Sequence, residues 1–294
     1  MQQTENHQGN SDVSQDTPKI VGNEDFISLV NKLSKNDTFP HTLLWGPSGA
    51  GKTTIAKYIA KVTGQTVESY YAPELSKMIL TLVLTGLSEN DIIIIDEIHA
   101  MKQGMLESIY QPLEEGKFQG ERLPKFTFIG ITTDLSHLTD ALIRRFRLVY
   151  RVNLYDIPEL VAVLTGLCRS DIEEDALLAV AMMSRGSPGI ARNHLEIIEE
   201  INEGVITAHV VFEYQRLKHI DLHGLEDIDI EYLRALKLHG TLSLSTVSSV
   251  LVEREDAIER NIEPFLFRQG LVIKSPKGRL LTPAGTSYLL EYHS

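Results

Sequence analysis

The sequence predicts an α/β fold: a parallel sheet that carries a phosphate-binding loop, then a small helical domain and a C-terminal module of three helices and a hairpin. Three observations predict this fold. Residues 45–54 fit Gly-x-x-x-x-Gly-Lys-Thr and lie between a strand pattern and a helical pattern. Residues 91–99 contain four consecutive isoleucines, which is typical of a strand buried on both faces. From residue 156 onward, helical spacing dominates until two short apolar runs near the end.

The glycine-rich loop predicts a site for a polyphosphate. Glycines allow the backbone to turn its N–H groups toward one point, and the helix that follows adds the positive end of its dipole. The alternative is a glycine-rich turn in an ordinary α/β domain, which the flanking strand (residues 42–45) and helix (residues 55–62) disfavour. We expect the nucleotide to contact Gly46, Pro47, Ser48, Gly49, Ala50, Gly51, Lys52, Thr53 and Thr54.

Two acidic residues at the end of the isoleucine strand complete the predicted chemistry. We expect Lys52 to reach the β- and γ-phosphates of ATP, while Thr53 and Asp96 hold Mg²⁺. Glu97 would polarise the attacking water. A pair of acids that merely caps a core strand is the alternative, and the phosphate loop upstream disfavours it. His99 has no Cys or His partner at ligand spacing, so we interpret it as a polar neighbour of the site.

Residues 126–133 predict another buried strand, and four arginines follow between positions 144 and 151. Thr133, at the end of the strand, has a hydroxyl that could orient the water beside the γ-phosphate; strand-end capping is the alternative. Basic runs usually form a solvated face. One arginine here has a more specific candidate role, which is to supply positive charge to the phosphoryl group in a neighbouring subunit.

The composition is that of a globular protein of more than one domain. Hydrophobic residues make up 43% of the chain, charged residues 23%, and no apolar run approaches membrane-spanning length. Cys168 is the only cysteine, which excludes an intrachain disulfide and predicts a cytoplasmic protein. The net charge of −12 disfavours a broad nucleic-acid footprint but leaves room for a narrow basic strip. The expected parts are a disordered tail (1–17), a nucleotide-binding domain (18–152), a helical lid (153–219) and a winged helix (220–294).

The winged helix is predicted from its order of elements. Helical patterns at residues 228–238, 245–251 and 254–269 precede two short apolar runs separated by a Ser-Pro-Lys-Gly turn. The wing carries Lys274, Lys277 and Arg279, which we expect to contact DNA phosphates. Such modules also serve as protein-docking domains, and three charges release only a few counterions.

Several motifs in this order resemble the RuvB family, the AAA+ motors that drive Holliday-junction branch migration in bacteria. They are Asp-Glu-Ile-His at 96–99, the strand at 126–133, Arg-Gly-Ser-Pro at 185–188, and the segments at 263–271 and 275–279. The resemblance covers the chain from about residue 18 to the end. It implies an AAA+ core, a lid and a winged helix that assemble as a hexamer around duplex DNA and use ATP with Mg²⁺. It also implies roles for Thr133 as first sensor, for Arg145 as trans-acting arginine finger, for Ile20 and Val21 beside the adenine, and for Lys277 and Arg279 on DNA.

The sequence departs from the family pattern in three places. Gly189 stands where the family has its second-sensor arginine after Pro188, and Arg192, about one helical turn on, is the predicted substitute. The hairpin at residues 116–125 is short and lacks the apolar tip that docks RuvA, which argues against the usual RuvA partner. The N-terminal stretch that reaches the adenine is mostly absent ahead of Ile20. These departures predict a divergent member of the family.

The leading functional prediction is an ATP-hydrolysing, DNA-translocating motor of the RuvB type. The alternative is an AAA+ ATP switch or loader that assembles on DNA or on a partner protein without branch migration, with slow hydrolysis as a reset. A clamp-loader-like subunit is a third interpretation, which the C-terminal winged helix disfavours.

Overall fold

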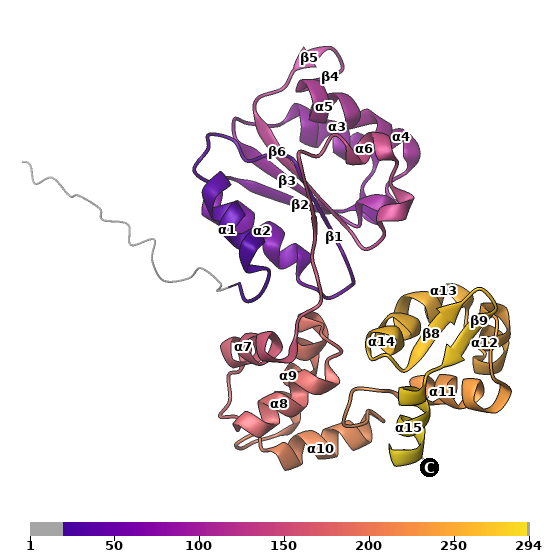
Figure 1. The fold of residues 1–294 in the computed structure, drawn as a ribbon. Helices are drawn as coiled ribbons and strands as arrows, with labels where there is room; N and C mark the ends of the chain where they lie inside the picture. Colours follow the sequence, from indigo (N-terminus) through magenta and orange to yellow (C-terminus); the bar gives the residue numbers. More distant parts are fainter. Residues whose placement is uncertain (1–19, 293–294) are drawn as a thin grey trace, which may run out of the picture. The chain divides into compact units, whose positions relative to one another are not determined.

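The computed structural model describes residues 20–292, which form two compact units that meet between Tyr155 and Asp156 (Figure 1). The predicted disordered tail, residues 1–17, and the last two residues of the predicted winged-helix domain lie outside the described residues.

The first unit contains a five-stranded sheet in the order β2-β3-β6-β1-β7. Every neighbouring pair is parallel. In this order β6 lies between β1 and β3, with Trp45 opposite Thr132 and Ile95 opposite Gly130. The predicted strands at β1, β3 and β6 are confirmed, whereas β7 occupies part of the arginine run for which no strand was expected. The strands span Thr42–Trp45 (β1), Val67–Tyr71 (β2), Asp91–Asp96 (β3), Phe126–Thr132 (β6) and Leu148–Arg151 (β7).

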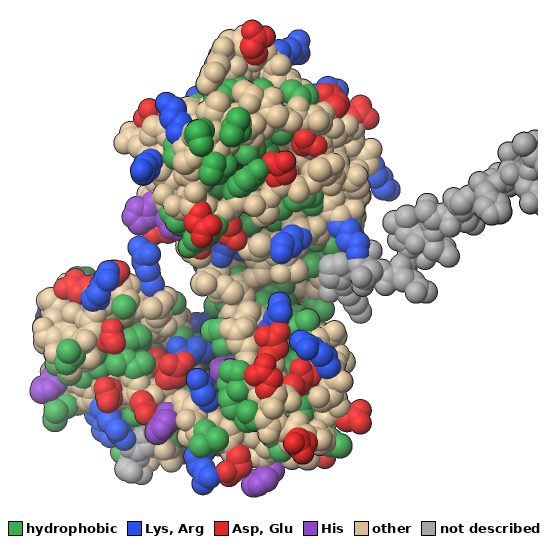
Figure 2. All heavy atoms as spheres, turned by 180° about the vertical axis from the view of Figure 1, so that it is seen from behind, with side chains coloured by type: hydrophobic (Ala, Val, Ile, Leu, Met, Phe, Trp, Pro, Cys, Tyr) green, Lys and Arg blue, Asp and Glu red, His purple; other side chains and the backbone are tan. Residues whose placement is uncertain are grey.

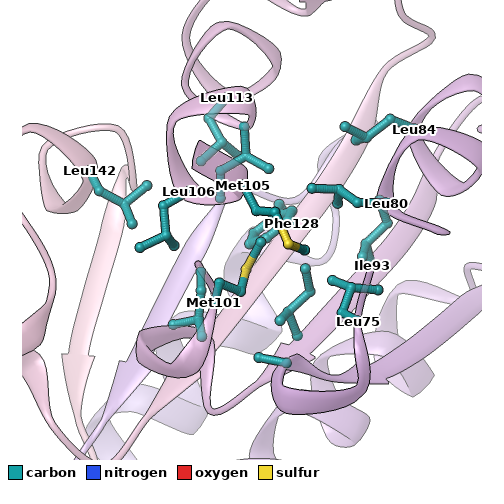
Figure 3. Close-up of a cluster of buried hydrophobic side chains, with 14 of the residues drawn as sticks. Leu75, Leu80, Leu84, Ile93, Met101, Met105, Leu106, Leu113, Phe128 and Leu142 are labelled. Atoms are coloured by element: carbon teal, nitrogen blue, oxygen red, sulfur yellow. The ribbon is translucent and has the colours of Figure 1, made fainter. Parts of the chain in front are cut away.

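Helices cover both faces of this sheet, so that its central strands are dry. Ile92 and Ile94 of β3 pack in one buried cluster with α1 and α2, and Ile93 and Ile95 pack in another with α3, α4 and α5 (Figure 3). This alternation confirms burial on both faces, the reason for four isoleucines in succession. The helices span Glu24–Leu33 (α1), Lys52–Thr63 (α2), Lys77–Thr85 (α3), Gln103–Ser108 (α4), Tyr110–Glu115 (α5) and Asp140–Ile143 (α6).

The second unit begins with four helices of the lid type. A capping box starts the first of them: the Asp156 carboxylate accepts from the Glu159 amide, and the Glu159 carboxylate accepts from the Asp156 amide, both at 2.8 Å. Their buried faces carry Leu, Ile, Val, Ala and Met side chains. The helices span Ile157–Leu167 (α7), Glu174–Met183 (α8), Pro188–Ile201 (α9) and Ala208–Leu217 (α10).

The rest of this unit forms the winged helix, with its own apolar core around Tyr232, Leu233 and Leu266. The third predicted helix is divided by a π-helical turn at Ile258–Ile262, and α15 after the hairpin was not predicted. The hairpin is antiparallel, and Lys274 faces Arg279 across it. The elements span Asp227–His239 (α11), Leu244–Leu251 (α12), Glu255–Ala257 (α13), Glu263–Arg268 (α14), Val272–Ser275 (β8), Gly278–Leu281 (β9) and Pro283–Tyr292 (α15).

Arg185, in the turn between α8 and α9, joins the lid to the winged helix. Its Nε donates to the Gly224 carbonyl at 2.9 Å, its guanidinium pairs with the fully buried Asp229, and its Cζ lies 4.5 Å from the centre of the Phe265 ring. Burial raises the pKa of Asp229 to about 6, and the positive charge of Arg185 opposes that shift. Arg268 in turn donates to the Arg185 carbonyl. The two parts of the unit are therefore held by a buried ion pair.

We predict that Arg185→Ala destabilises the second unit by about 3–5 kcal/mol, because Asp229 would be left buried without its partner. Hydrogen exchange of peptides covering residues 220–232 should become faster. Arg192→Ala is the matched control: its pair with Glu196 is exposed, so the loss should stay below about 1 kcal/mol. Equal exchange rates in Arg185→Ala and the wild type would contradict the assignment.

His41 makes the stability of the first unit depend on pH. Burial, with a smaller contribution from Arg147, lowers its pKa from 6.5 to about 4, and its Nδ1 accepts the Phe128 amide at 3.0 Å. Because the folded pKa lies below the unfolded one, the unfolded chain binds the proton first. Stability should therefore fall as pH drops from about 6.5 to about 4, by up to about 3 kcal/mol.

Urea unfolding at a series of pH values, followed by the fluorescence of Trp45, measures this dependence, since Trp45 lies in β1 and is the only tryptophan. His41→Asn keeps a hydrogen-bond acceptor near the Phe128 amide but does not titrate, so its stability should fall less steeply in this window. Identical slopes for the two proteins would count against His41 as the source.

Candidate nucleotide-binding site

The strand order places the ends of β1, β6 and β3 next to one another at the carboxyl edge of the sheet. β1 leads into the phosphate loop, β6 leads into Thr133, and β3 leads into Glu97. Ligands of open α/β sheets bind at this edge, where the strand order reverses. The topology therefore brings together residues that lie up to about 90 positions apart in the sequence.

The loop itself accepts only glycine at its first position. Gly46 has φ of 146°, and a Cβ at this residue would lie 2.2 Å from the carbonyl oxygen of Val152. Its amide donates to the Thr132 carbonyl at 3.3 Å, which ties the start of the loop to β6. The loop ends at Gly51, also with positive φ, and α2 begins at Lys52. The N-terminus of a twelve-residue helix thus lies behind the loop.

Lys52 is buried within the loop. Its Nζ donates to the carbonyl oxygens of Gly46 and Pro47 at 2.9 and 2.7 Å. Burial lowers the pKa of its ammonium group, while the negative charges of Glu97 and Asp96 oppose that shift. An ammonium group held by two carbonyl oxygens and close to two carboxylates is a point charge directed at an anionic ligand.

Thr53 and Asp96 are already in contact. The Thr53 hydroxyl donates to Asp96 Oδ2 at 2.9 Å, and Asp96 Oδ1 accepts the Glu97 amide at 2.9 Å. Among residues 20–292, no group of three His, Cys, Asp or Glu side chains could hold a metal ion. One hydroxyl and one carboxylate nevertheless fit Mg²⁺, which takes few protein ligands and completes its shell with phosphate oxygens and water.

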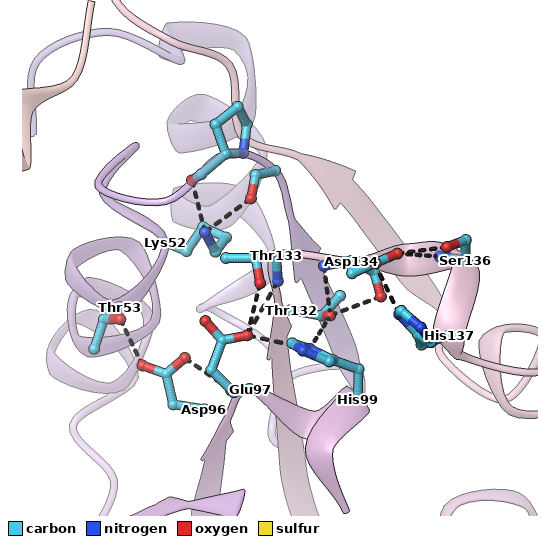
Figure 4. Close-up of polar contacts among 12 residues, drawn as sticks. Lys52, Thr53, Asp96, Glu97, His99, Thr132, Thr133, Asp134, Ser136 and His137 are labelled. Atoms are coloured by element: carbon cyan, nitrogen blue, oxygen red, sulfur yellow. Dashed lines mark hydrogen bonds and ion pairs between the residues drawn. The ribbon is translucent and has the colours of Figure 1, made fainter. Parts of the chain in front are cut away.

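Glu97 lies at the centre of a hydrogen-bond network at the ends of β3 and β6 (Figure 4). Its backbone has φ of 52°, an uncommon conformation for a non-glycine residue and one that occurs often at active sites. Its Oε2 accepts the Thr133 hydroxyl at 2.9 Å and the Thr133 amide at 3.3 Å, and it lies 3.1 Å from Nδ1 of His99. Glu97 and Thr133, which the sequence assigned to the same water molecule, thus lie in direct contact, and His99 lies beside them.

Arg145 follows α6 and is held by neighbours that the sequence did not reveal. Its Cζ lies 4.3 Å from the centre of the Tyr110 ring, and its Nη2 lies 2.8 Å from Glu114. Its buried Nε has no hydrogen-bond partner. Arg145 is thus ordered by contacts within its own unit and is not part of the loose solvated face that a basic run usually forms. Its role as a finger in a neighbouring subunit stays a prediction.

The remaining predicted nucleotide contacts are divided between the two units. Ile20 and Val21 precede α1; Ile20 packs against the core below the loop and lines an open hollow of about 450 Å³ beside α1. Pro188 and Arg192 belong to α9 in the second unit, where Arg192 pairs with Glu196 at 2.7 Å. Gly189 has no side chain that could contact a phosphate. The contact of Arg192 with nucleotide stays a prediction.

The three basic residues of the wing differ in their exposure. Lys277 is exposed in the turn, and Lys274 is exposed and lies 3.4 Å from Glu259; their contact with DNA stays a prediction. Arg279, in contrast, is only 6% exposed: its Nε donates to Glu263 at 2.6 Å and its Nη2 to Glu259 at 2.9 Å. The charge of Arg279 is therefore paired with these two glutamates, which disfavours a contact with DNA; that contact stays a prediction.

Basic and acidic side chains are interspersed on the face of the molecule that Figure 2 shows. Within residues 20–292, no helix is long and apolar enough to cross a membrane.

Comparisons with known proteins give the family. Residues 19–152 match the Holliday junction DNA helicase RuvB P-loop domain, and residues 222–290 match the RuvB C-terminal winged helix domain. The chain is 34% identical to the Holliday junction branch migration complex subunits RuvB of Rickettsia africae and of a Wolbachia strain. These matches cover 87% and 88% of this chain and 82% and 86% of those proteins.

The solved structures agree. The Thermotoga maritima RuvB Holliday junction branch migration motor superposes with a TM-score of 0.81 at 25% identity, over 92% of this chain and 95% of that one. The sequence-based resemblance and the predicted fold class are confirmed. With its phosphate loop, its acidic strand end and its winged helix, the chain belongs to the RuvB family of AAA+ P-loop ATPases.

Proposed function

We propose that this protein hydrolyses ATP to drive branch migration of Holliday-junction DNA, as a ring of identical subunits. The observation that carries the proposal is the convergence of Lys52, Thr53, Asp96, Glu97 and Thr133 at the ends of three adjacent strands. Family membership supports the choice of DNA as the substrate, and the winged helix with its exposed Lys277 offers a surface for it.

Each side chain of the cluster has a distinct part in hydrolysis. Lys52 supplies the fixed positive charge for the β- and γ-phosphates, and Thr53 with Asp96 would hold Mg²⁺, which neutralises charge on the phosphate oxygens. Glu97 accepts a proton from the attacking water. Thr133, whose hydroxyl donates to Glu97, lies where it can orient this water.

The assembly is part of the proposal. Arg145 would act in a neighbouring subunit, which makes a hexameric ring the working form. The functional domains are proposed as residues 18–152, 153–219 and 220–294, in a cytoplasmic protein. The β4–β5 hairpin supports a loading partner other than the usual RuvA. Its strands span only Lys117–Phe118 and Glu121–Arg122, and Gln119 and Gly120 form its exposed tip.

A junction-processing assay tests the function. With a four-way junction, wild-type protein should show DNA-stimulated ATP hydrolysis and strand movement. Glu97→Gln should still bind ATP but hydrolyse it at least about 100-fold more slowly. Lys52→Ala should lose binding as well as hydrolysis, whereas Lys57→Ala, an exposed lysine on the same helix, should behave like the wild type.

Undiminished hydrolysis in Lys52→Ala would refute the site. ATP-dependent rings that bind DNA without moving strands would instead favour the ATP switch or loader, the alternative that the missing guanidinium at Gly189 supports.

The wing gives an independent prediction. Lys277→Glu should weaken DNA binding and flatten its dependence on salt concentration, because an exposed phosphate contact is lost. Lys237→Glu makes the same charge change on α11 and should leave the salt dependence unaltered. Fluorescence anisotropy of a labelled duplex at several salt concentrations measures both, and equal slopes for the two variants would exclude Lys277 as a contact.

A further inference from the structure

His99 lies beside the reacting groups, yet the proposed mechanism gives it no part. It occupies the single 3₁₀ turn Ile98–Ala100, which follows Glu97 directly, and its side chain is 19% exposed. Nδ1 lies 2.9 Å from the Thr132 hydroxyl oxygen and 3.1 Å from Glu97 Oε2. His99 therefore touches both the end of β6 and the carboxylate that acts as the base.

The hydrogen-bond network assigns the proton to Nδ1 of His99. The Thr132 hydroxyl donates its own hydrogen to the Asp134 carbonyl at 3.0 Å, and its oxygen accepts the Asp134 amide at 3.0 Å. With its single hydrogen used, Thr132 can only accept from the imidazole. Nδ1–H therefore donates to the Thr132 oxygen, and Glu97 Oε2 lies 3.1 Å from the same nitrogen. Thr132, which accepts this hydrogen bond, is completely buried and is therefore held in place by the surrounding protein.

The two carboxylate oxygens of Glu97 have different contacts. Oε2 accepts two hydrogen bonds, from the hydroxyl and the amide of Thr133, and lies 3.1 Å from Nδ1 of His99. Oε1 accepts no hydrogen bond from any described residue and lies on the side of Lys52 and Thr53 in Figure 4. A carboxylate held by one oxygen presents the other in a fixed direction, which is what a general base requires.

We propose that His99 is a positioning residue for ATP hydrolysis: it holds Glu97 Oε2 against the end of β6, so that Oε1 faces the nucleotide. This inference rests on the proposed function and adds a residue to it. A positioning residue is needed because the Thr133 hydroxyl is assigned two partners, Glu97 and the attacking water. When the hydroxyl turns to the water, the Thr133 amide and the close contact with His99 Nδ1 are what remain on Oε2.

The test compares two replacements of His99 in the full-length protein, measured as ATP hydrolysis without DNA. His99→Asn places an amide N–H near the position of Nδ1, while His99→Leu fills similar space without a donor. His99→Leu should lower kcat about 10- to 100-fold with an unchanged Kd for a fluorescent ATP analogue. His99→Asn should recover kcat to within about threefold of the wild type.

His137→Leu is the matched control. The His137 ring lies 6.0 Å from that of His99 at an angle of 25°, but its Nδ1 pairs with Asp134 rather than with Glu97. Its kcat should stay within about threefold of the wild type. Thr132→Val removes the acceptor on β6 while preserving shape, so it should lower kcat in the same direction as His99→Leu, and the two losses should be less than additive.

Each outcome decides a separate question. A wild-type protein that does not hydrolyse ATP would refute the proposed function itself. Normal wild-type activity with kcat of His99→Leu within threefold of it would overturn the positioning role. If His99→Asn were as slow as His99→Leu, the imidazole would act by its shape and not by its donor, which would also overturn the proposal. The unchanged Kd shows that a slow variant has kept its folded site.

Discussion

The placement of β6 between β1 and β3 is the constraint on which the rest of the site depends. β6 is parallel to both neighbours, so the residues that follow the three strands all lie at the carboxyl edge of the sheet. The register is equally decisive, because a slip of one residue would move every side chain of β6 to the opposite face of the sheet. Such a slip would remove Thr132 from His99 and Thr133 from Glu97. Burial on both faces is what specifies the register.

The strand ends are shaped by backbone conformations that the buried sheet sustains. Gly46 approaches Val152 too closely for any side chain, and Glu97 adopts a positive φ directly after β3. Such conformations cost free energy of about 1–3 kcal/mol each for residues other than glycine, and they persist where the surrounding packing fixes them. Here the isoleucine-rich strand and its two layers of helices supply that packing. The packing of the apolar core thus fixes the direction in which the Glu97 carboxylate points.

The parts of the fold that could be predicted are those in which local pattern and burial agree. The isoleucines of β3 and the glycine loop after β1 identified both strands and the residues that follow them. Helix α3 shows where pattern alone is not enough: Met78 and Leu82 are 71% and 62% exposed, whereas Leu80 and Leu84 are buried. With apolar residues on every side, periodicity cannot select a face. The burial of Arg279 could not be predicted either, since its acidic partners, Glu259 and Glu263, are distant in sequence.

Gly189 stands where the family pattern predicts a second-sensor arginine, a side chain that would link the lid to the nucleotide. Arg185 bears on a different question, which is how the lid is joined to the winged helix. Arg185 contacts Gly224, Asp229 and Phe265 of the winged-helix part, and Arg268 returns a hydrogen bond to its carbonyl. Separating the two parts would break the pair with Asp229, the hydrogen bond to the Gly224 carbonyl and the contact with the Phe265 ring. Arg185 therefore couples the lid helices to the winged-helix part of the same unit, and Gly189 next to Pro188 adds no side chain to the lid.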